Sequence, residues 1–251
     1  MSTNSVISVG HDRLVNLRDV GGLPLVGGGL TRRDVLYRGD APYPGDAAPD
    51  GVAVWPPATV IDLRSRTERE RVGYVWSART AIHRIALHDE AAPTQALSSS
   101  LQELYGRMLD AAGPRVAGAT SVVARARGPI FVHCAAGKDR TGLVVAALLL
   151  AAGAEPHAVV SDYTSTADNM AALRDRWKAK GLGRDSGRPI PEEFLLAPVE
   201  AISVVVDTLT NWPGGAGKWL TDHGADPDDV RAWRLRIRAV DSSTTSEREA
   251  S

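Results

Sequence analysis

One short stretch of the chain gathers the side chains best suited to covalent chemistry. Residues 129–142 read PIFVHCAAGKDRTG, and five residues separate Cys134 from Arg140. A cysteine thiolate is a strong nucleophile, and a guanidinium can bind two oxygens of one anion. The spacing therefore favours a loop that wraps a single phosphate, with the sulfur beneath it and Arg140 reaching across to two phosphate oxygens.

The same stretch predicts a strand, a tight loop and the start of a helix. The backbone N–H groups of such a loop converge on one point, and the helix dipole adds positive potential there. These N–H groups and Arg140 would stabilise the thiolate of Cys134, which then attacks phosphorus. We expect the phosphate to be bound by the loop residues Ala135, Ala136, Gly137 and Lys138.

Three residues of this stretch have further candidate roles. Thr141 is placed to donate its hydroxyl to the sulfur and to help it leave when water cleaves a phospho-cysteine. His133 is expected to orient the loop through its ring N–H groups, with a buried structural histidine as the alternative. Lys138 adds a positive charge at the lip of the loop for an acidic head group or a second phosphate, and its alternative is a solvated lysine.

The first chemical step also needs an acid that protonates the leaving oxygen. Asp139 lies inside the loop, where a bound phosphate would favour its protonated form. Asp62 is the rival, because it ends a predicted strand and sites in parallel sheets lie at that edge. Its alternative role is a cap or a partner for a nearby arginine. Asp19 and Asp89 are further candidates, and the chemistry calls for no metal and no cofactor.

A nucleotide-binding loop is a competing interpretation of Gly137 and Lys138, and the motif fails. It needs a glycine where Val132 stands and a hydroxyl side chain where Asp139 stands. Because Cys134 is the only cysteine, the chain can form neither an intramolecular disulfide nor a cysteine-based zinc site.

The elements that would position these residues are short strands alternating with longer helices. The continuous run 59–63 is typical of a strand covered on both faces, and Ser65 and Glu68 have the spacing of a capping box. The other expected strands are 36–39, 81–85 and 129–133. The expected helices are 97–109, 114–127, 142–152, 156–164 and a buried one at 198–210, with a further helix starting at Asp226 and Pro227. This alternation predicts an α/β fold with a mostly parallel central sheet flanked by helices.

Composition limits the classes of function. The 29 basic and 30 acidic side chains nearly cancel, which argues against a general nucleic-acid binder. The longest apolar run, 143–152, is about half of what a membrane span needs, so an integral membrane protein is not expected. Residues 1–10 lack the apolar core of a signal peptide. We expect frayed ends at 1–10 and 241–251 around one domain at 11–240.

The stretch from His133 to Gly142 resembles the signature of the protein tyrosine phosphatase superfamily. Three further segments resemble an atypical bacterial tyrosine/serine phosphatase branch of that superfamily: 16–22 (NLRDVGG), 36–39 (LYRG) and 61–65 (IDLRS). Together these segments extend the resemblance over most of residues 11–240.

The resemblance implies a cysteine-dependent phosphatase acting on phosphotyrosine and, in some members, on phosphoserine, phosphothreonine and phosphoinositides. A phosphoprotein or phosphoinositide would be the substrate and inorganic phosphate the product. The implied fold is a parallel sheet flanked by helices with a helical lid, for which 88–127 and 162–191 are candidates. Asn16, Arg18 and Asp19 would support the catalytic loop. The branch includes a protein exported without a signal peptide, so a cytoplasmic and a secreted location both stay open.

Two other interpretations compete with an active phosphatase. A catalytically inactive phosphate-binding module would keep the loop, although Cys134, Arg140 and Thr141 are all present. Another cysteine-loop enzyme is the second. A sulfurtransferase does not need the Arg-Thr-Gly ending at 140–142, and an arsenate reductase needs resolving cysteines that this chain lacks.

Overall fold

The structure is a computed structural model, and it describes residues 11–87, 100–182 and 196–239. A five-stranded sheet in the order β1-β2-β5-β3-β4 lies at its centre. The strands are β1 (Arg18–Asp19), β2 (Leu36–Gly39), β3 (Thr59–Asp62), β4 (Ala81–Arg84) and β5 (Ile130–His133). Strand β1 runs antiparallel to β2, and the remaining pairs are parallel, which confirms the expected mostly parallel sheet.

The register of the three central strands determines which residues meet at the carboxyl edge of the sheet. Gly39 of β2 and Asp62 of β3 are both paired with His133 of β5. All residues of these three strands are buried, as expected for strands covered on both faces. The residue after His133 is Cys134, so the chain leaves the sheet at this edge with the cysteine as its first loop residue.

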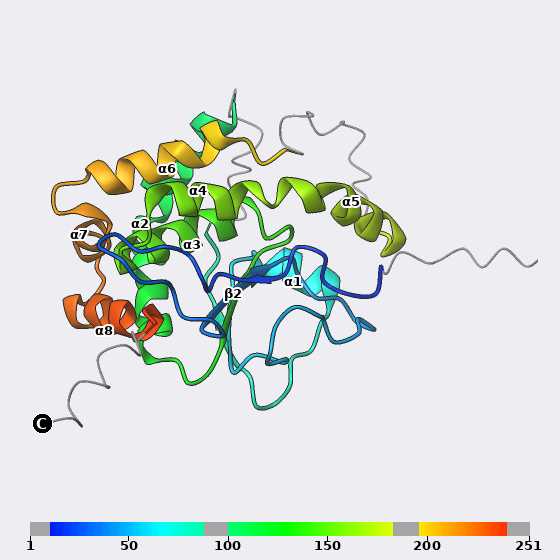
Figure 1. Cartoon of the computed structure of the whole chain (residues 1–251). Helices are drawn as coiled ribbons and strands as arrows, with labels where there is room; N and C mark the ends of the chain where they lie inside the picture. Colours follow the sequence, from blue (N-terminus) through cyan, green and yellow to red (C-terminus); the bar gives the residue numbers. More distant parts are fainter. Residues whose placement is uncertain (1–10, 88–99, 183–195, 240–251) are drawn as a thin grey trace, which may run out of the picture.

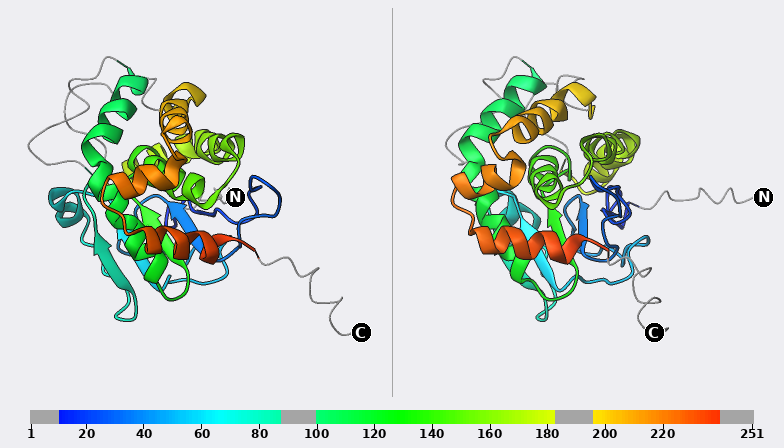
Figure 2. Two further views of the ribbon diagram at one scale, coloured as in Figure 1. Left: turned by 90° about the vertical axis from the view of Figure 1, so that its left-hand side faces the viewer. Right: turned by 60° about the vertical axis from the view of Figure 1, so that its left-hand side comes forward.

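The described helices gather mainly over one face of the sheet, where α3, α4 and α6 are stacked (Figure 1). Their bounds are α1 (Arg66–Val72), α2 (Leu101–Arg125), α3 (Asp139–Ala152), α4 (Pro156–Thr164), α5 (Met170–Ala179), α6 (Val199–Asn211), α7 (Gly215–Asp222) and α8 (Pro227–Ile237). A 3-10 helix, η2 (Ala167–Asn169), joins α4 to α5. Figure 2 shows the long α2 (green) and α8 (orange to red) crossing beside the sheet.

The two faces of the sheet are covered differently. Helix α3 is buried at every position from Thr141 to Ala152 and forms the centre of the larger core. The other face carries a small cluster in which Phe131 packs edge-on against Trp55 and Trp76. Long loops rather than helices supply this second cover.

One expected helix boundary is wrong. The sequence predicted a break before Pro114, but α2 runs unbroken through it. Proline removes a single N–H donor from the helix interior, and the packing of α2 against α6 and α8 outweighs this loss. Gly113 allows a close approach here, because a Cβ atom at this position would lie 2.1 Å from the ring of His223, the C-cap of α7.

Two further helices differ in detail from the expectation. Helix α3 begins at Asp139, three residues earlier than predicted, so the catalytic stretch enters the helix directly. Helix α6 was expected to be a buried helix rather than a surface one. It is amphipathic instead, with Val205 and Leu209 buried and Val199 about half exposed, at 49%. Short β1, α5 and α7 had not been predicted.

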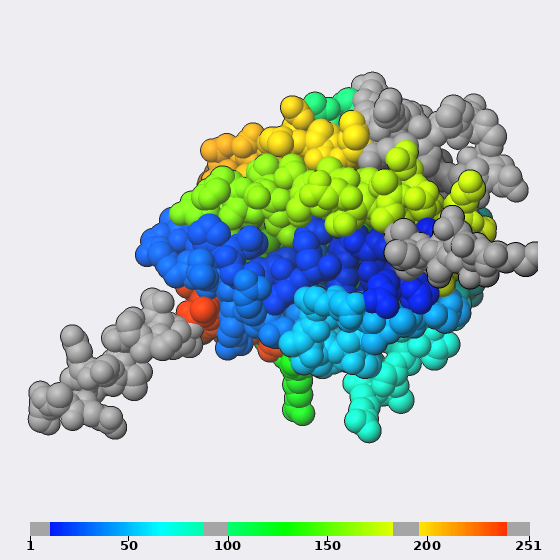
Figure 3. Space-filling view, turned by 45° about the vertical axis from the view of Figure 1, so that its right-hand side comes forward, coloured from blue at the N-terminus to red at the C-terminus, as the bar shows by residue number. Residues whose placement is uncertain are grey.

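The N-terminal segment of the described chain lies alongside the helices of the middle of the sequence. Figure 3 shows this segment (blue) in a band that follows α4 and α5 (yellow-green). The expected frayed ends lie outside the described residues, and so do parts of both lid candidates. The described parts of those candidates are helical. No helix in the described ranges is long and apolar enough to cross a membrane.

Candidate active site

The stretch with the cysteine forms the loop between β5 and α3 at the carboxyl edge of the sheet. We call residues 134–138 the anion loop. Cys134 is 2% exposed and lies at its start, and Asp139 is the first residue of α3. The structure thus has the strand, loop and helix N-terminus that the sequence predicted.

Donors from outside the anion loop hold four successive carbonyl groups. The pairs are His133 Nδ1 with Cys134 O at 3.3 Å, Ala41 N with Ala135 O at 3.2 Å, Asn16 Nδ2 with Ala136 O at 2.9 Å, and Arg38 Nη2 with Gly137 O at 2.9 Å. A trans peptide unit points its C=O and its N–H in opposite directions. The amides of residues 135–138 are therefore directed to the inner side of the loop.

The inner side of the loop carries backbone N–H groups that are not used as hydrogen-bond donors. The amides of Ala135, Ala136 and Gly137 have no acceptor within the described residues. Converging amides at a helix N-terminus bind anions well. Gly137 makes this geometry possible with a φ of +70°, and a Cβ atom there would lie 2.3 Å from the backbone of Gly39.

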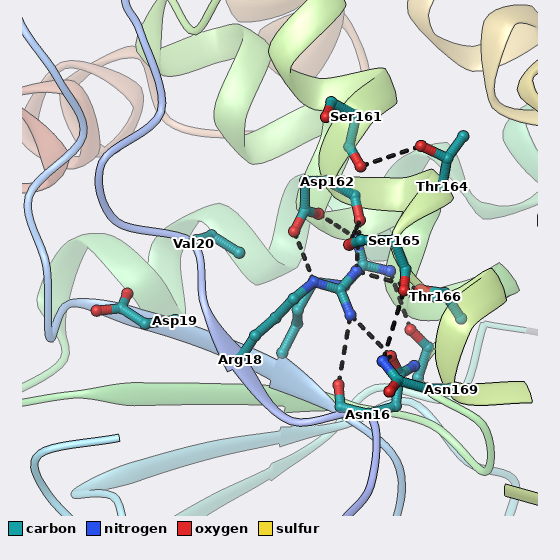
Figure 4. Close-up of polar contacts among 12 residues, drawn as sticks. Asn16, Arg18, Asp19, Val20, Ser161, Asp162, Thr164, Ser165, Thr166 and Asn169 are labelled. Atoms are coloured by element: carbon teal, nitrogen blue, oxygen red, sulfur yellow. Dashed lines mark hydrogen bonds and ion pairs between the residues drawn. The ribbon is translucent and has the colours of Figure 1, made fainter. Parts of the chain in front are cut away.

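Two of the donors that hold the loop, Arg38 and Asn16, are themselves fixed by one carboxylate, Asp162 of α4, which binds Arg38 directly and Asn16 through Arg18. Its Oδ1 accepts from Arg18 Nε at 2.7 Å and its Oδ2 from Arg38 Nη1 at 2.5 Å. Arg18 Nη1 in turn donates to Asn16 Oδ1 at 2.8 Å, as Figure 4 shows. Burial raises the pKa of Asp162, but the charges of Arg38 and Arg18 outweigh it, so the pKa lies below the ordinary value. We call Asn16, Arg18, Arg38 and Asp162 the loop brace.

Arg140 lies in the first turn of α3 and is paired with Glu68. The two carboxylate oxygens accept from Nη1 at 2.6 Å and from Nη2 at 2.7 Å. Burial lowers the pKa of Arg140, but Glu68 and the negative charge of Cys134 raise it above its ordinary value. Glu68 also accepts from the amide of Ser65 as part of the predicted capping box, so the N-terminus of α1 fixes the guanidinium.

The predicted rivals for the general acid have different surroundings. Arg64 binds the carboxylate of Asp62 through Nε at 2.9 Å and Nη2 at 2.8 Å. Burial raises the pKa of Asp62, but His133 and three interactions with Arg64 lower it to about 2. The partner role that the sequence offered as the alternative for Asp62 is thus the one that the structure has.

Asp139 is more exposed than its rival, with its side chain 25% exposed against 4% for Asp62. The hydroxyl of Tyr105 donates to Oδ1 at 2.9 Å, and Lys138 Nζ lies 3.4 Å from the same oxygen. The other two candidates are less informative. Asp19 accepts from the amides of Gly21 and Asp34, away from the loop, and Asp89 lies outside the described residues.

His133 and Lys138 are both buried. Burial lowers the pKa of His133 to about 4 against the opposing charge of Asp62, so the ring is neutral and we assign the proton to Nδ1, which donates to Cys134 O. The orienting role expected of His133 stays a prediction. Lys138 was expected at the lip of the loop or in solvent, and neither is correct. It is 2% exposed, and its ammonium group donates to the carbonyl of Leu196 at 2.8 Å.

Thr141 is buried, and its hydroxyl has no hydrogen-bond partner within the described residues. The expected bond to the sulfur of Cys134 is therefore not formed in this structure. A buried hydroxyl without a partner is unusual and costs free energy. The hydroxyl belongs to the residue that follows Arg140 in the first turn of α3.

Sequence reasoning missed four residues that contact the site: Arg38, Glu68 as a partner of Arg140, Tyr105 and Asp162. Each is distant in sequence from the anion loop, and none has a local pattern that names its contact. The capping box did point to Glu68, although only as a helix start. No group of three or more His, Cys, Asp or Glu side chains in the described ranges is arranged to hold a metal ion.

Comparisons with known proteins bear on this arrangement. A family model described as the tyrosine phosphatase family matches residues 9–239. The triple specificity protein phosphatase PtpB of Mycobacterium tuberculosis is 48% identical over 117 residues, which cover 42% of this chain and 42% of PtpB. A putative tyrosine-protein phosphatase of Cupriavidus necator is 28% identical over 187 residues, 68% of each chain. The crystal structure of TpbA from P. aeruginosa is similar over 80% of this chain and 87% of TpbA, with 16% identity and a TM-score of 0.31.

Proposed function

The chain belongs to the tyrosine phosphatase family, whose model covers residues 9–239, and from this premise we propose that it hydrolyses phosphomonoesters through a phospho-cysteine at Cys134. The observation that carries the proposal is the anion loop. Outside donors hold the carbonyls of residues 134–137, so the amides of residues 135–138 are directed to the inner side of the loop. A dianionic phosphoryl group matches this set of donors.

Arg140 supplies the remaining charge for the phosphoryl group. Glu68 takes one hydrogen from each of its terminal nitrogens. A guanidinium has five N–H donors, which leaves the Nε edge and the second Nη2 hydrogen for two phosphate oxygens. Bidentate binding of this kind is strong and directional, and it would stabilise the equatorial oxygens in the transition state.

The first step forms a bond from Sγ of Cys134 to phosphorus and breaks the bond from phosphorus to the ester oxygen. We assign the proton for that oxygen to Asp139. It is partly exposed beside the loop, whereas Asp62 is paired with Arg64 and its pKa of about 2 makes it a poor proton donor near neutral pH.

In the second step water attacks phosphorus, the sulfur leaves, and inorganic phosphate is released. Asp139, now a carboxylate, takes the proton of the water. Thr141 would donate its unpaired hydroxyl to the sulfur as negative charge returns to it. Every proton and bond in the cycle is accounted for by the protein, the ester and one water.

Phosphotyrosine is the substrate class that we propose first. Cys134 is almost fully buried, at 2% exposed, and the aryl ring of phosphotyrosine makes it the longest of the phosphorylated side chains. PtpB is by its name a triple specificity protein phosphatase, and the resemblance in sequence implies phosphoserine, phosphothreonine and phosphoinositides as further candidates. The burial of Lys138 weakens the earlier argument that its charge would select an inositol lipid.

Hydrolysis of p-nitrophenyl phosphate in EDTA, by the wild type and by Cys134→Ser, tests the proposal. We expect turnover in the wild type, and at least about a 10³-fold loss in the variant, because a serine hydroxyl is far less nucleophilic than a thiolate. A rapidly quenched reaction with ³²P-labelled substrate should trap a phospho-enzyme in the wild type alone. Activity that survives in Cys134→Ser would reject the mechanism, and vanadate binding by both proteins without turnover would favour the inactive binding module.

A further inference from the structure

Two buried tyrosine hydroxyls form a chain that ends on the carboxylate of Asp139. Tyr105 of α2 donates to Asp139 Oδ1 at 2.9 Å, and its oxygen lies 2.6 Å from the hydroxyl of Tyr163 in α4. The two rings pack edge to face with centroids 5.9 Å apart. Both hydroxyls lie in the core, where water does not compete for their hydrogen bonds.

Counting protons gives this chain a direction. A tyrosine hydroxyl has one hydrogen to donate. If Tyr105 gives its hydrogen to Asp139, then the short contact between the two hydroxyls requires Tyr163 to be the donor and Tyr105 the acceptor. Burial raises the pKa of Tyr105 well above 10, and Asp139 and Tyr163 raise it further, so Tyr105 remains protonated at neutral pH.

The direction of the chain decides which oxygen of Asp139 carries the acidic proton. Oδ1 accepts from Tyr105 and faces the ammonium group of Lys138, so a proton on this oxygen would replace a favourable contact with a clash between two donors. The proton of the neutral acid therefore sits on Oδ2. The same hydrogen bond fixes the rotation of the carboxyl group, which its partial exposure would otherwise leave loose.

We propose that Tyr105, oriented by Tyr163, is a positioning residue that presents the Oδ2 proton of Asp139 to the leaving oxygen of the substrate. The inference rests on the proposed function, because it assigns a role within that reaction. Tyr105 does not touch the reacting atoms, and it acts through Asp139 alone. If the role of the tyrosine were purely structural, its removal would lower activity to the same extent for every substrate.

The leaving group distinguishes these two roles. General acid catalysis matters most when the leaving oxygen is a strong base, and it contributes about 10²–10⁴-fold. Phenyl phosphate releases a phenolate like that of tyrosine, with a pKa of about 10, whereas a difluorinated umbelliferyl phosphate releases a weak base that hardly needs an acid. A defect in the acid slows the first substrate far more than the second, and a defect in folding slows both alike.

The experiment measures kcat/KM for both substrates in wild type, Tyr105→Phe, Asp139→Asn and the double variant. We expect Asp139→Asn to lose about 10²–10³-fold on phenyl phosphate and less than about 3-fold on the activated ester. Tyr105→Phe should lose about 10-fold on phenyl phosphate and less than about 2-fold on the activated ester. In the double variant the tyrosine change should add no further loss, because the group that it positions is gone.

Tyr37→Phe is the matched control. Tyr37 is also fully buried and also donates to an aspartate, Asp34, at 2.7 Å, but it lies near the other end of β2, away from the anion loop. This variant should lose stability like Tyr105→Phe and should keep the wild-type ratio between the two substrates. A similar change of ratio in Tyr37→Phe would mean that the readout reports folding, and would reject the inference.

The failures of the inference and of the proposed function are distinguishable. If Asp139→Asn changes the ratio and Tyr105→Phe does not, the positioning role is wrong while the acid assignment stands. If Asp139→Asn leaves the ratio unchanged, another acid operates and the inference falls with the assignment. If Cys134→Ser retains activity toward both esters, the phospho-cysteine mechanism itself is wrong.

Discussion

At the scale of single residues, the proposed function has the guanidinium of Arg140 divide its donors between the protein and the substrate. Glu68 binds the end of the group that carries both terminal nitrogens, and the Nε edge would bind the phosphate. The carboxylate therefore does not compete for the same hydrogens. It determines the plane of the guanidinium, which decides whether two phosphate oxygens can be bound at once.

Glu68→Gln tests this orienting role. The amide keeps the shape of the side chain and can still complete the capping box, but it replaces a charge-assisted pair by one neutral hydrogen bond. We expect kcat/KM for aryl phosphates to fall about 10-fold, while the midpoint of urea unfolding changes little. Ser65→Ala is the control, since it removes the cap at a cost of about 1 kcal/mol and leaves the pair with Arg140 in place. Equal activity losses in the two variants would contradict the orienting role.

At the scale of elements, the anion loop is held from outside by segments that are far from it in sequence. Arg38 of β2, Ala41 just after that strand and Asn16 before β1 donate to the loop. Asp162 of α4 holds Arg38 in turn. The loop has no regular hydrogen bonds of its own between Cys134 and Lys138. Its shape is therefore a property of the packing of these segments, and a local change of backbone can destroy it.

Gly137→Ala should destroy the shape of the anion loop. The added Cβ atom would lie 2.3 Å from the carbonyl group of Gly39, at a φ of +70°. We expect the loop to move by about 1 Å and kcat to fall at least about 100-fold, measured with p-nitrophenyl phosphate. Gly73→Ala is matched, because Gly73 has a φ of +64° with nothing within 4 Å of the new atom. Loss of activity in Gly73→Ala of the same size would show that backbone strain, and not the contact with Gly39, is responsible.

The elements also show which features a single sequence can predict. The strand, loop and helix around Cys134 and the cap at Ser65 follow from local patterns, and the structure has them. The break at Pro114 was wrong because a local cost was outweighed by tertiary packing. Tyr105 and Asp162 could not be assigned, since their partners lie 34 and 124 residues away and no local spacing encodes such contacts.

At the scale of the whole molecule, Arg176 of α5 connects three separate segments. Its fully buried guanidinium donates to Asp40 at 3.1 Å, to Asp46 at 2.7 Å, and to the carbonyl of His11 at 3.3 Å. It also lies over the ring of Tyr43, 4.5 Å from the centroid. Asp40 accepts from the amides of Val15 and Asn16, so this cation also supports the segment that carries one member of the loop brace.

Arg176→Met should leave the buried carboxylate of Asp40 without its cation, while Asp46 keeps its ion pair with Lys180 at 3.1 Å. We expect the free energy of unfolding to fall by about 3–5 kcal/mol, measured by urea denaturation at pH 7. Arg176→Lys retains the charge but loses the planar guanidinium that donates to several acceptors at once. The free energy of unfolding should therefore fall by less in this variant. A decrease below about 1 kcal/mol in Arg176→Met would show that the cation is not needed to join these segments.

The stability of the whole molecule should also depend on pH through His133. The ring is fully buried against Asp62, Arg64, Arg140 and the anion loop, and its pKa is lowered to about 4. The unfolded chain binds a proton near pH 6.5 and the folded chain does not, so stability falls as the pH drops from 6.5 toward 4. This contribution amounts to about 2 kcal/mol at pH 5 and vanishes at pH 7. Asp40, whose pKa burial raises to about 6, acts in the opposite direction over part of the same range.

Comparing wild type with His133→Asn isolates the histidine, because Asp40 is common to both proteins. We expect urea unfolding at pH 7 and pH 5 to show that the wild type loses about 2 kcal/mol more on acidification than the variant does. The readout is the loss of unfolding free energy between pH 7 and pH 5 in the wild type minus the same loss in the variant. A general loss of stability in His133→Asn therefore does not affect it. Equal losses in the two proteins would mean that the buried ring takes up its proton without unfolding. In that case the anion loop would tolerate a charged His133, and the neutral ring that donates to Cys134 O would no longer be a requirement of the fold.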